Sequence, residues 1–158
     1  MPTLLVVHHT PSPSLDAMLD AVLHGTRAEG IDDVDVVTKA ALEATAIDAL
    51  AADGYIIGTP ANLGYISGAL KHFFDLAYYP CLNSSKHRPF GAYIHGDDDT
   101  AGAAAAIAKI TTGLQWRKVT DDVSLTGTPS LTDLEACWNL GATVAASLVA
   151  DEPQRRCG

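Results

Sequence analysis

The chain has 158 residues, of which 47% are hydrophobic and 18% are charged, which fits one globular domain and excludes a disordered chain. Its formal net charge of −9 argues against a nucleic-acid-binding protein, because contacts with a phosphate backbone use clustered Lys and Arg. The longest purely apolar runs are far too short to cross a bilayer, so we expect no membrane insertion.

Apolar, β-branched runs alternate with amphipathic stretches along the chain, and this alternation is the signal for parallel β-α units. The runs predict strands at residues 3–8, 35–38, 54–57, 91–95 and 119–126. Apolar residues at helical spacing predict helices at residues 14–29, 47–52 and 67–77, from after residue 100 to about 113, and at 131–149.

Right-handed crossovers between such strands place helices on both faces of the sheet. We therefore expect an α/β fold: a three-layer α/β/α sandwich around a doubly wound, five-stranded parallel sheet with the order 2-1-3-4-5. Residues 1–150 form the predicted domain. Residues 151–158, with the sequence DEPQRRCG, form a predicted disordered tail.

In open parallel sheets, ligands bind beyond the carboxyl ends of the strands, where the strand order reverses. The unusual residues of this chain gather after the first, third and fourth strands, in segments that we call loop one (9–14), loop three (59–67) and loop four (96–100). With the predicted order these loops lie side by side, so one ligand could touch all three.

Loop one carries the hydroxyls of Thr10, Ser12 and Ser14 just before a predicted helix, whose free amides and dipole favour a phosphate. It contains no Lys or Arg, so a phosphate monoester is a better guest than a triphosphate. The patterns GxxxxGK[ST] and GxGxxG are absent, which argues against a P-loop nucleotidase and a classical dinucleotide fold. The structural alternative is that Ser14 caps the helix while Thr10 and Ser12 fill a turn.

Loop three contains Pro60 and Gly64, and Gly68 follows it directly, so main-chain amides at this strand-to-helix connection could approach a flat ring closely. A plain turn with Ser67 as the helix N-cap is the alternative. Loop four carries a run of aspartates and could also contact the ligand. The alternative is that it is a solvated loop in which Asp99 or Thr100 caps the next helix.

The stretch DGYIIGTPANLGYISGALKHFFD, together with loops one and four, resembles the flavodoxin-like superfamily, and in particular its NAD(P)H-dependent FMN and quinone reductase branch. The resemblance covers essentially the whole domain, although only the three loops match at the level of motifs. It implies a flavodoxin-like fold, a bound FMN, and NAD(P)H as the electron donor. No catalytic residue is implied, because the flavin carries the electrons.

The same resemblance implies which residues hold the cofactor. The phosphate would contact Thr10, Ser12 and Ser14, with main-chain help from Leu15. The isoalloxazine would lie between two groups of residues: Pro60, Ala61, Asn62, Leu63, Gly64 and Tyr65 on one side, and His95, Gly96, Asp97 and Asp98 on the other. His9 would be a further residue at the flavin edge. Pro11 and Pro13 depart from the flavodoxin pattern because they remove two amide donors, so we expect the phosphate to depend more on hydroxyls.

Other candidate groups have weaker signals. No HxH or HExxH spacing occurs, and the three cysteines are far apart without CxxC spacing, so we expect no metal site and no disulfide framework. His9 and His95 are as compatible with a structural role as with one at the flavin edge. Tyr78, Tyr79 and Trp116 fit an interface or a substrate lid, or merely an exposed aromatic surface. Lys86, His87 and Arg88 form the basic cluster that could meet a nicotinamide phosphate.

These observations predict an FMN-dependent oxidoreductase that passes electrons from NAD(P)H to a quinone or another small acceptor. One alternative is a flavodoxin-type electron carrier, whose acidic surface would suit basic protein partners. Another is a flavodoxin-like protein that binds no flavin. The start MPTLLVVHH has no basic leader or small-residue cleavage site, so we expect a cytoplasmic location. Related reductases often build the acceptor pocket between chains, which is compatible with a homodimer or homotetramer.

Overall fold

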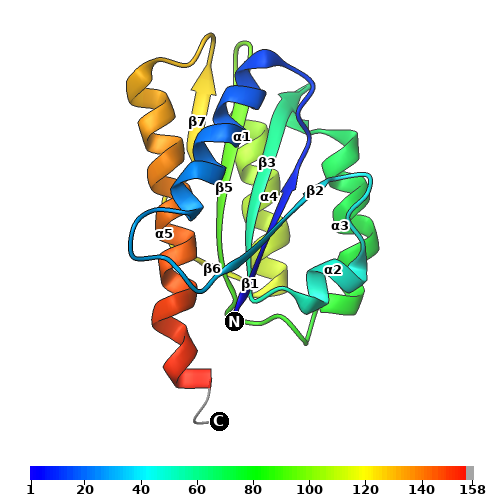
Figure 1. Ribbon diagram of the computed structural model, residues 1–158. Coiled ribbons are helices and arrows are strands. Elements are labelled where there is room, and N and C mark those ends of the chain that lie inside the picture. Colours follow the sequence, from blue (N-terminus) through cyan, green and yellow to red (C-terminus); the bar gives the residue numbers. More distant parts are fainter. Residues whose placement is uncertain (156–158) are drawn as a thin grey trace.

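A twisted, mainly parallel sheet forms the centre of the molecule. The computed structural model describes residues 1–155, and the side-chain surroundings of residues 1–150. The principal strands are β1 (Thr3–His8), β2 (Asp35–Ala40), β3 (Gly54–Asn62) and β5 (Pro89–Gly96), and they lie in the order β2-β1-β3-β5. In Figure 1 their arrows point toward the top, where the loops that precede α1 and α3 lie. The predicted doubly wound order is confirmed.

The fifth strand differs from the prediction. Instead of one strand over residues 119–126, two short strands pair with β5: β6 (Arg117–Lys118) beside its start and β7 (Val123–Thr126) beside its end. The interruption contains Asp121 and Asp122, a residue type that strands disfavour. Lys118 Nζ lies 3.0 Å from an Asp122 carboxylate oxygen, and this ion pair spans the break.

Five helices cover the sheet in the part of the chain that the structure describes: α1 (Pro13–Thr26), α2 (Ala46–Ala51), α3 (Gly68–Cys81), α4 (Ala101–Leu114) and α5 (Leu131–Arg155). Helices α1 and α5 pack on one face, and α2, α3 and α4 pack on the other (Figure 1). The three-layer prediction is therefore confirmed. Helix α5 extends to Arg155, whereas the sequence predicts a disordered tail from residue 151; residues 156–158 of that tail lie outside the described part.

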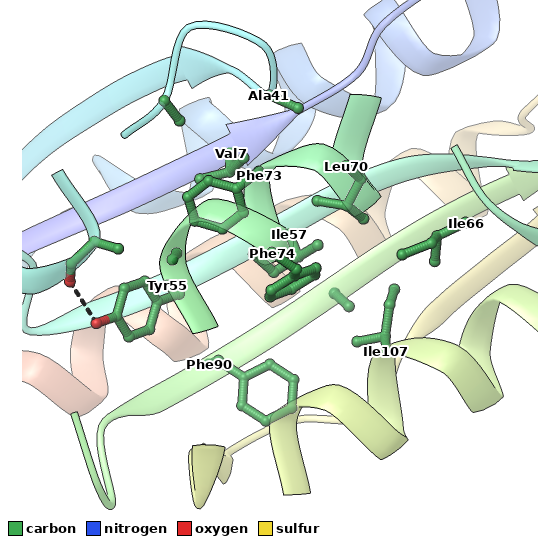
Figure 2. Close-up of a cluster of buried hydrophobic side chains, with 14 of the residues drawn as sticks. Val7, Ala41, Tyr55, Ile57, Ile66, Leu70, Phe73, Phe74, Phe90 and Ile107 are labelled. Atoms are coloured by element: carbon green, nitrogen blue, oxygen red, sulfur yellow. Dashed lines mark hydrogen bonds between the residues drawn. The ribbon is translucent and has the colours of Figure 1, made fainter. Parts of the chain in front are cut away.

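Two apolar clusters hold the layers together. The larger cluster lies between the sheet and α2, α3 and α4, and Figure 2 shows Phe73 and Phe74 in its middle with Tyr55 to one side. Tyr55 stacks on Trp116 with a ring-centroid separation of 3.8 Å, and its hydroxyl donates to the Ala49 carbonyl at 2.6 Å. Trp116 is thus a core residue, and its predicted place in an interface or lid is wrong. The burial of Tyr55 raises its pKa to about 12, although the hydrogen bond from Arg88 opposes that rise.

Helices α1 and α5 approach closely because each has a glycine that faces the backbone of the other helix. A Cβ on Gly25 would lie 1.9 Å from the Trp138 carbonyl oxygen, and one on Gly141 would lie 2.1 Å from the Val22 carbonyl oxygen. A side chain of any size at either position would force the helices apart, so the α1–α5 layer depends on these two residues.

Gly141→Ala should therefore lower the free energy of unfolding by about 1–2 kcal/mol, even though Ala in a helix is favoured over Gly by about 1 kcal/mol. Urea unfolding measures the change. The matched control is Gly68→Ala in the first turn of α3, where a Cβ meets nothing within 4 Å, so the substitution should leave stability unchanged or raise it. Equal effects of the two substitutions would contradict the proposed packing role.

No helix in the described part of the chain is both long enough and apolar enough to cross a membrane. The same residues contain no group of three or more His, Cys, Asp and Glu side chains that could hold a metal ion.

Candidate functional site

Loops one, three and four meet at one pocket above the carboxyl ends of β1, β3 and β5. Pro60 and His95 are direct register partners on β3 and β5, which brings loops three and four together. The start of α1 closes the third side. The pocket has a volume of about 170 Å³, and its lining is Pro11, Ser12, Leu15, Pro60, Ala61, Asn62, His95, Gly96 and Asp97. The predicted convergence of the three loops is therefore present in the structure.

Loop one is arranged differently from the prediction at its helix cap. Ser12, not Ser14, is the N-cap of α1, and its Oγ accepts from the Leu15 amide at 3.3 Å. This bond leaves the Ser12 O–H free to donate to a ligand. Thr10 Oγ1 lies 2.6 Å from His8 Nδ1. Burial, and to a smaller degree neighbouring His9, lowers the pKa of His8, while Glu43 opposes the shift. The His8 ring therefore favours its neutral form near Thr10.

The amides of loop one provide donors between the two prolines. Within residues 1–155, the amides of Thr10, Ser12 and Ser14 donate to no protein acceptor, while Pro11 and Pro13 have no amide hydrogen. Free amides and a hydroxyl at a helix N-terminus suit an anion without the help of a cation. The donor set thus fits a phosphate monoester.

Loop three is a β-hairpin and not the irregular loop that the sequence predicts. Strand β3 continues to Asn62, and β4 (Tyr65–Ile66) pairs back onto it in antiparallel register. Leu63 and Gly64 form the two-residue turn with φ values of 51° and 73°. Such turns require positive φ at both positions, so the conformation explains Gly64, while Leu63 adopts it at a cost.

The hairpin is fixed on both sides. The Ser67 amide donates to Thr59 Oγ1 at 3.2 Å, and Ser67 Oγ in turn accepts from the Leu70 amide, so Ser67 is the N-cap of α3, one of the alternatives weighed from the sequence. On the other side, a Cβ on Gly102 would lie 1.8 Å from the Gly64 carbonyl oxygen. The start of α4 therefore packs directly against the turn. Gly68 has open space around its Cα, so close packing does not explain it.

Loop four comes close to loop three because residue 96 has no side chain. A Cβ on Gly96 would lie 3.0 Å from the Asp99 carbonyl oxygen and 3.2 Å from the Ala61 Cβ. Asp99 Oδ1 accepts from the Ala101 amide at 2.8 Å, so Asp99 provides the cap of α4 and Thr100 makes no side-chain cap bond. Asp97 lines the pocket, while Asp98 is exposed beside it.

His95 is held by the turn that follows β7. Its Nε2 lies 2.7 Å from the Gly127 carbonyl oxygen, and since a carbonyl only accepts, Nε2 carries a proton. This bond fixes the orientation of the ring at the pocket wall. His9, which follows β1, has an Nδ1 that is buried without a hydrogen-bond partner among the described residues, although His9 does not line the pocket.

Several predicted cofactor-binding residues lie outside the pocket lining. Leu63 is fully exposed at the hairpin turn, and Tyr65 is 43% exposed on β4. The remaining ones are His9, Thr10, Ser14, Gly64 and Asp98. Their roles stay predictions. Pro11 was noted in the sequence only for its missing amide, yet its ring forms part of the wall; no sequence signal marks that contact, because it depends on the fold of loop one.

Arg88 has a structural role at the opposite end of the sheet. Its Nη1 donates to the Ala52 carbonyl at 2.7 Å, the Leu50 carbonyl at 3.0 Å and the Tyr55 hydroxyl at 3.1 Å, which satisfies the C-terminal end of α2. Arg88 directly precedes β5, so it lies at the amino end of the strands. The 86–88 cluster therefore lies away from this pocket, and its contact with a nicotinamide phosphate stays a prediction.

A second pocket of about 210 Å³ lies along α3. Its lining is Lys71, Phe74, Asp75, Tyr78, Tyr79 and Ile110. Tyr79 is 79% exposed, whereas Tyr78 places its hydroxyl against Gly113, where an added Cβ would lie 2.3 Å from it. The two tyrosines therefore form an aromatic surface between α3 and α4, apart from the three loops.

Comparison with solved structures places the fold in the flavodoxin-like class. A flavodoxin from the domain Archaea superposes with a TM-score of 0.77 at 17% identity, covering 92% of this chain and 97% of the other. A flavodoxin, WrbA-like protein from Agrobacterium tumefaciens gives 0.73 at 19%, covering 93% and 97%. Rubredoxin oxygen:oxidoreductase from Desulfovibrio gigas gives 0.78 at 16%, covering 94% of this chain but 36% of that one. At such identities the likeness shows the fold alone.

Comparison of sequences identifies the family within this fold class. A family described as NADPH-dependent FMN reductase matches residues 22–127, which is more than half of the chain. The chain belongs to the NADPH-dependent FMN reductase family. A flavodoxin from Aquifex aeolicus (strain VF5) is 36% identical over 75 residues, which cover 48% of this chain and 40% of that protein. The family indicates FMN as the cofactor and is consistent with NAD(P)H as the donor, as the sequence predicts.

Proposed function

We propose that this protein is an FMN-dependent oxidoreductase that receives electrons from NAD(P)H and passes them to a quinone or another small acceptor. The observation that supports it most is the meeting of loops one, three and four at one pocket in a chain of this family. FMN supplies the electron-transfer chemistry when bound. The protein's part is to bind and orient it and to exclude water.

The residues divide into two groups by chemistry. At the start of α1, the hydroxyls of Thr10, Ser12 and Ser14 and their amides would hold the phosphate, aided by the helix dipole. The Leu15 amide contributes indirectly, since it fixes the Ser12 oxygen and so directs the Ser12 proton outward.

The walls beyond loop one combine apolar and polar residues. Pro60, Ala61 and Asn62 would line one side of the ring, and His95, Gly96 and Asp97 would line the other. We propose that the hairpin turn, with Leu63, Gly64 and Tyr65, and the adjacent His9 and Asp98 contact the exposed edge of the flavin. No side chain is assigned a role as a general acid, a general base or a nucleophile.

A flavodoxin-type electron carrier is the second candidate. The net charge of −9 would suit docking to basic redox partners, and the Aquifex relative is a flavodoxin. A cytoplasmic location and a homodimer or homotetramer stay predictions from the sequence.

Titration of the purified protein with FMN, followed by anaerobic NADPH and NADH, tests the proposal. The reductase should bind FMN with a measurable heat and a shifted visible spectrum, and a nicotinamide nucleotide should then bleach the flavin band within seconds to minutes. A carrier should bind FMN but leave the band nearly unchanged under the same conditions. An absence of heat and of spectral change on adding FMN would rule out both functions and leave the flavin-free alternative.

A further inference from the structure

His8, the last residue of β1, contacts loop one through its ring. Its Nδ1 lies 2.6 Å from Thr10 Oγ1, which is a short distance for a hydrogen bond between nitrogen and oxygen. Both residues are partly buried, so water competes little for this bond. Thr10 directly precedes Pro11 and Ser12, which line the pocket. The ring therefore acts on a hydroxyl at the proposed phosphate position.

The backbone that carries the ring is fixed on both sides. His8 is the register partner of Ala40 on β2 and of Gly58 on β3. Its carbonyl accepts from the Ala41 amide at 2.8 Å, and the next amide, that of His9, donates to the Gly58 carbonyl at 3.0 Å. A hydroxyl proton, in contrast, rotates about its C–O bond to suit its partners. In this pair the ring is the fixed member, and the hydroxyl is the one that it orients.

The hydrogen bond between the two side chains has two possible directions, and they present different faces to a ligand. If the Thr10 hydroxyl donates to Nδ1, its single proton is used and only oxygen lone pairs are left for a ligand. If Nδ1–H donates to Oγ1, the hydroxyl proton is free to donate to a ligand. The oxygens of a phosphate dianion only accept, so the second direction is the one that suits a phosphate.

A proton on Nδ1 is available without adding charge to the site. Because burial lowers the pKa of His8, its ring favours the neutral form. A neutral imidazole carries one proton, on either Nδ1 or Nε2. For His95 the Gly127 carbonyl decides which nitrogen is protonated, since a carbonyl only accepts. A hydroxyl both donates and accepts, so at His8 a bound anion decides it.

We propose that His8 is a positioning residue for the FMN phosphate: in the FMN-loaded protein its Nδ1 carries a proton and donates to Thr10 Oγ1, which directs the Thr10 hydroxyl proton toward the phosphate. The inference rests on the proposed function, which places the phosphate at loop one. It adds a residue that acts on the phosphate through Thr10. A hydrogen bond from a hydroxyl to an ionised oxygen is stronger than a neutral one, and donors in a chain polarise one another.

Long-range ¹H–¹⁵N correlation spectra of the ¹⁵N-labelled full chain, saturated with oxidised FMN near neutral pH, test the proton position directly. They distinguish a protonated from an unprotonated imidazole nitrogen, and the His8 signals are those lost in His8→Asn. Nδ1 of His8 should be protonated in the FMN-loaded protein. An unprotonated Nδ1 there overturns the inference. This measurement uses the unmodified protein, so it does not depend on how well a variant folds.

Two substitutions of His8 test whether its N–H acts on the phosphate. His8→Leu removes the donor and should weaken FMN binding about three- to tenfold, because the freed hydroxyl then samples three staggered positions and loses the polarising donor. His8→Asn is the matched control: its amide nitrogen follows Cβ and Cγ, as Nδ1 does, and should keep FMN affinity within about twofold. Riboflavin, which lacks the phosphate, should bind all three proteins alike in calorimetry. Equal losses of FMN and riboflavin affinity in His8→Leu would overturn the inference.

A double variant shows whether His8 acts through Thr10. Thr10→Val removes the hydroxyl and should weaken FMN binding by about tenfold or more, the value of a hydrogen bond to a charged group. In that background His8→Leu should cost nothing further, because the hydroxyl that the ring orients is gone. Additive losses in the double variant would contradict the inference.

The outcomes separate this inference from the proposed function. Tight binding of FMN with an unprotonated His8 Nδ1, or with no loss in His8→Leu, refutes the role of His8 and leaves the reductase intact. The expected spectra and affinities without bleaching of the flavin by NADPH or NADH support the role of His8 and refute the reductase. A chain that binds no FMN refutes both.

Discussion

Ser12→Asp should weaken FMN binding by about 100-fold while leaving the fold intact. Ser12 is the N-cap of α1 and lines the pocket at the proposed phosphate position. Aspartate caps helices as well as serine does, and its charge suits the helix dipole, so stability should not fall. A carboxylate about 5 Å from a phosphate dianion, at an effective dielectric constant between those of surface and bulk, costs about 3 kcal/mol, which corresponds to the 100-fold loss.

Ser12→Asn is the matched control, because asparagine has nearly the same shape and capping strength but no charge. It should lose no more than about tenfold in FMN affinity, because the side-chain amide of asparagine can still donate a hydrogen bond to the phosphate. Calorimetry with FMN and riboflavin measures both variants. Riboflavin lacks the phosphate and should bind Ser12→Asp and Ser12→Asn equally. If Ser12→Asp bound FMN as tightly as the unmodified protein, the phosphate would have to lie away from α1.

Gly58→Ala should destabilise the protein by about 3 kcal/mol, at the upper end of the usual cost of overpacking. Gly58 on β3 is the register partner of Tyr93 on β5. An added Cβ would lie 2.1 Å from Tyr93 Cζ, 2.2 Å from its hydroxyl oxygen and 2.5 Å from Cε1. Tyr93 is fully buried, so the ring has nowhere to move without disturbing α1 or α5. Urea unfolding followed by circular dichroism gives the free energy of unfolding.

A rescue and a control make the result specific. Tyr93→Leu should be destabilising alone, but the double variant with Gly58→Ala should cost clearly less than the sum of the two single changes, because the clash is then gone. Gly91→Ala, in β5, is the control: its Cβ would approach side-chain methyl groups of Val144 and Thr120 at 2.9 and 3.1 Å, which can shift. It should cost less than half as much as Gly58→Ala. Additive effects of the two changes would contradict the proposed contact.

Tyr93 also shows how the pocket floor is built. Gly58 and Tyr93 lie two register positions before Pro60 and His95, and Tyr93 packs on the face covered by α1 and α5. The Tyr93 hydroxyl has no hydrogen-bond partner among the described residues, and burial, with a smaller effect of Cys137, raises the pKa of this group. The ring therefore serves as a rigid neutral support under the two residues that join loops three and four.

The sequence by itself determined the layered fold, the strand order and the three loops that meet at the pocket. These depend on periodicity: buried parallel strands such as Thr3–His8 must be apolar and β-branched, and the chirality of crossovers leaves few topologies. The helix cap at Ser67 was also one of the alternatives given by the sequence. An N-cap bonds to an amide only three residues further along the chain, so its partner is local.

Only the tertiary structure decided the features that depend on contacts between distant segments. Leu63 accepts a positive φ because the hairpin is held by Gly102 of α4 and by the Thr59–Ser67 bond, and no local preference of leucine predicts that. Arg88 reaches the end of α2 across 36 positions of sequence, so a basic cluster in the sequence did not reveal its partner. The choice of Ser12 over Ser14 as the cap, and the placement of cations away from the pocket, likewise depend on packing, because neither follows from the order of residues along one element.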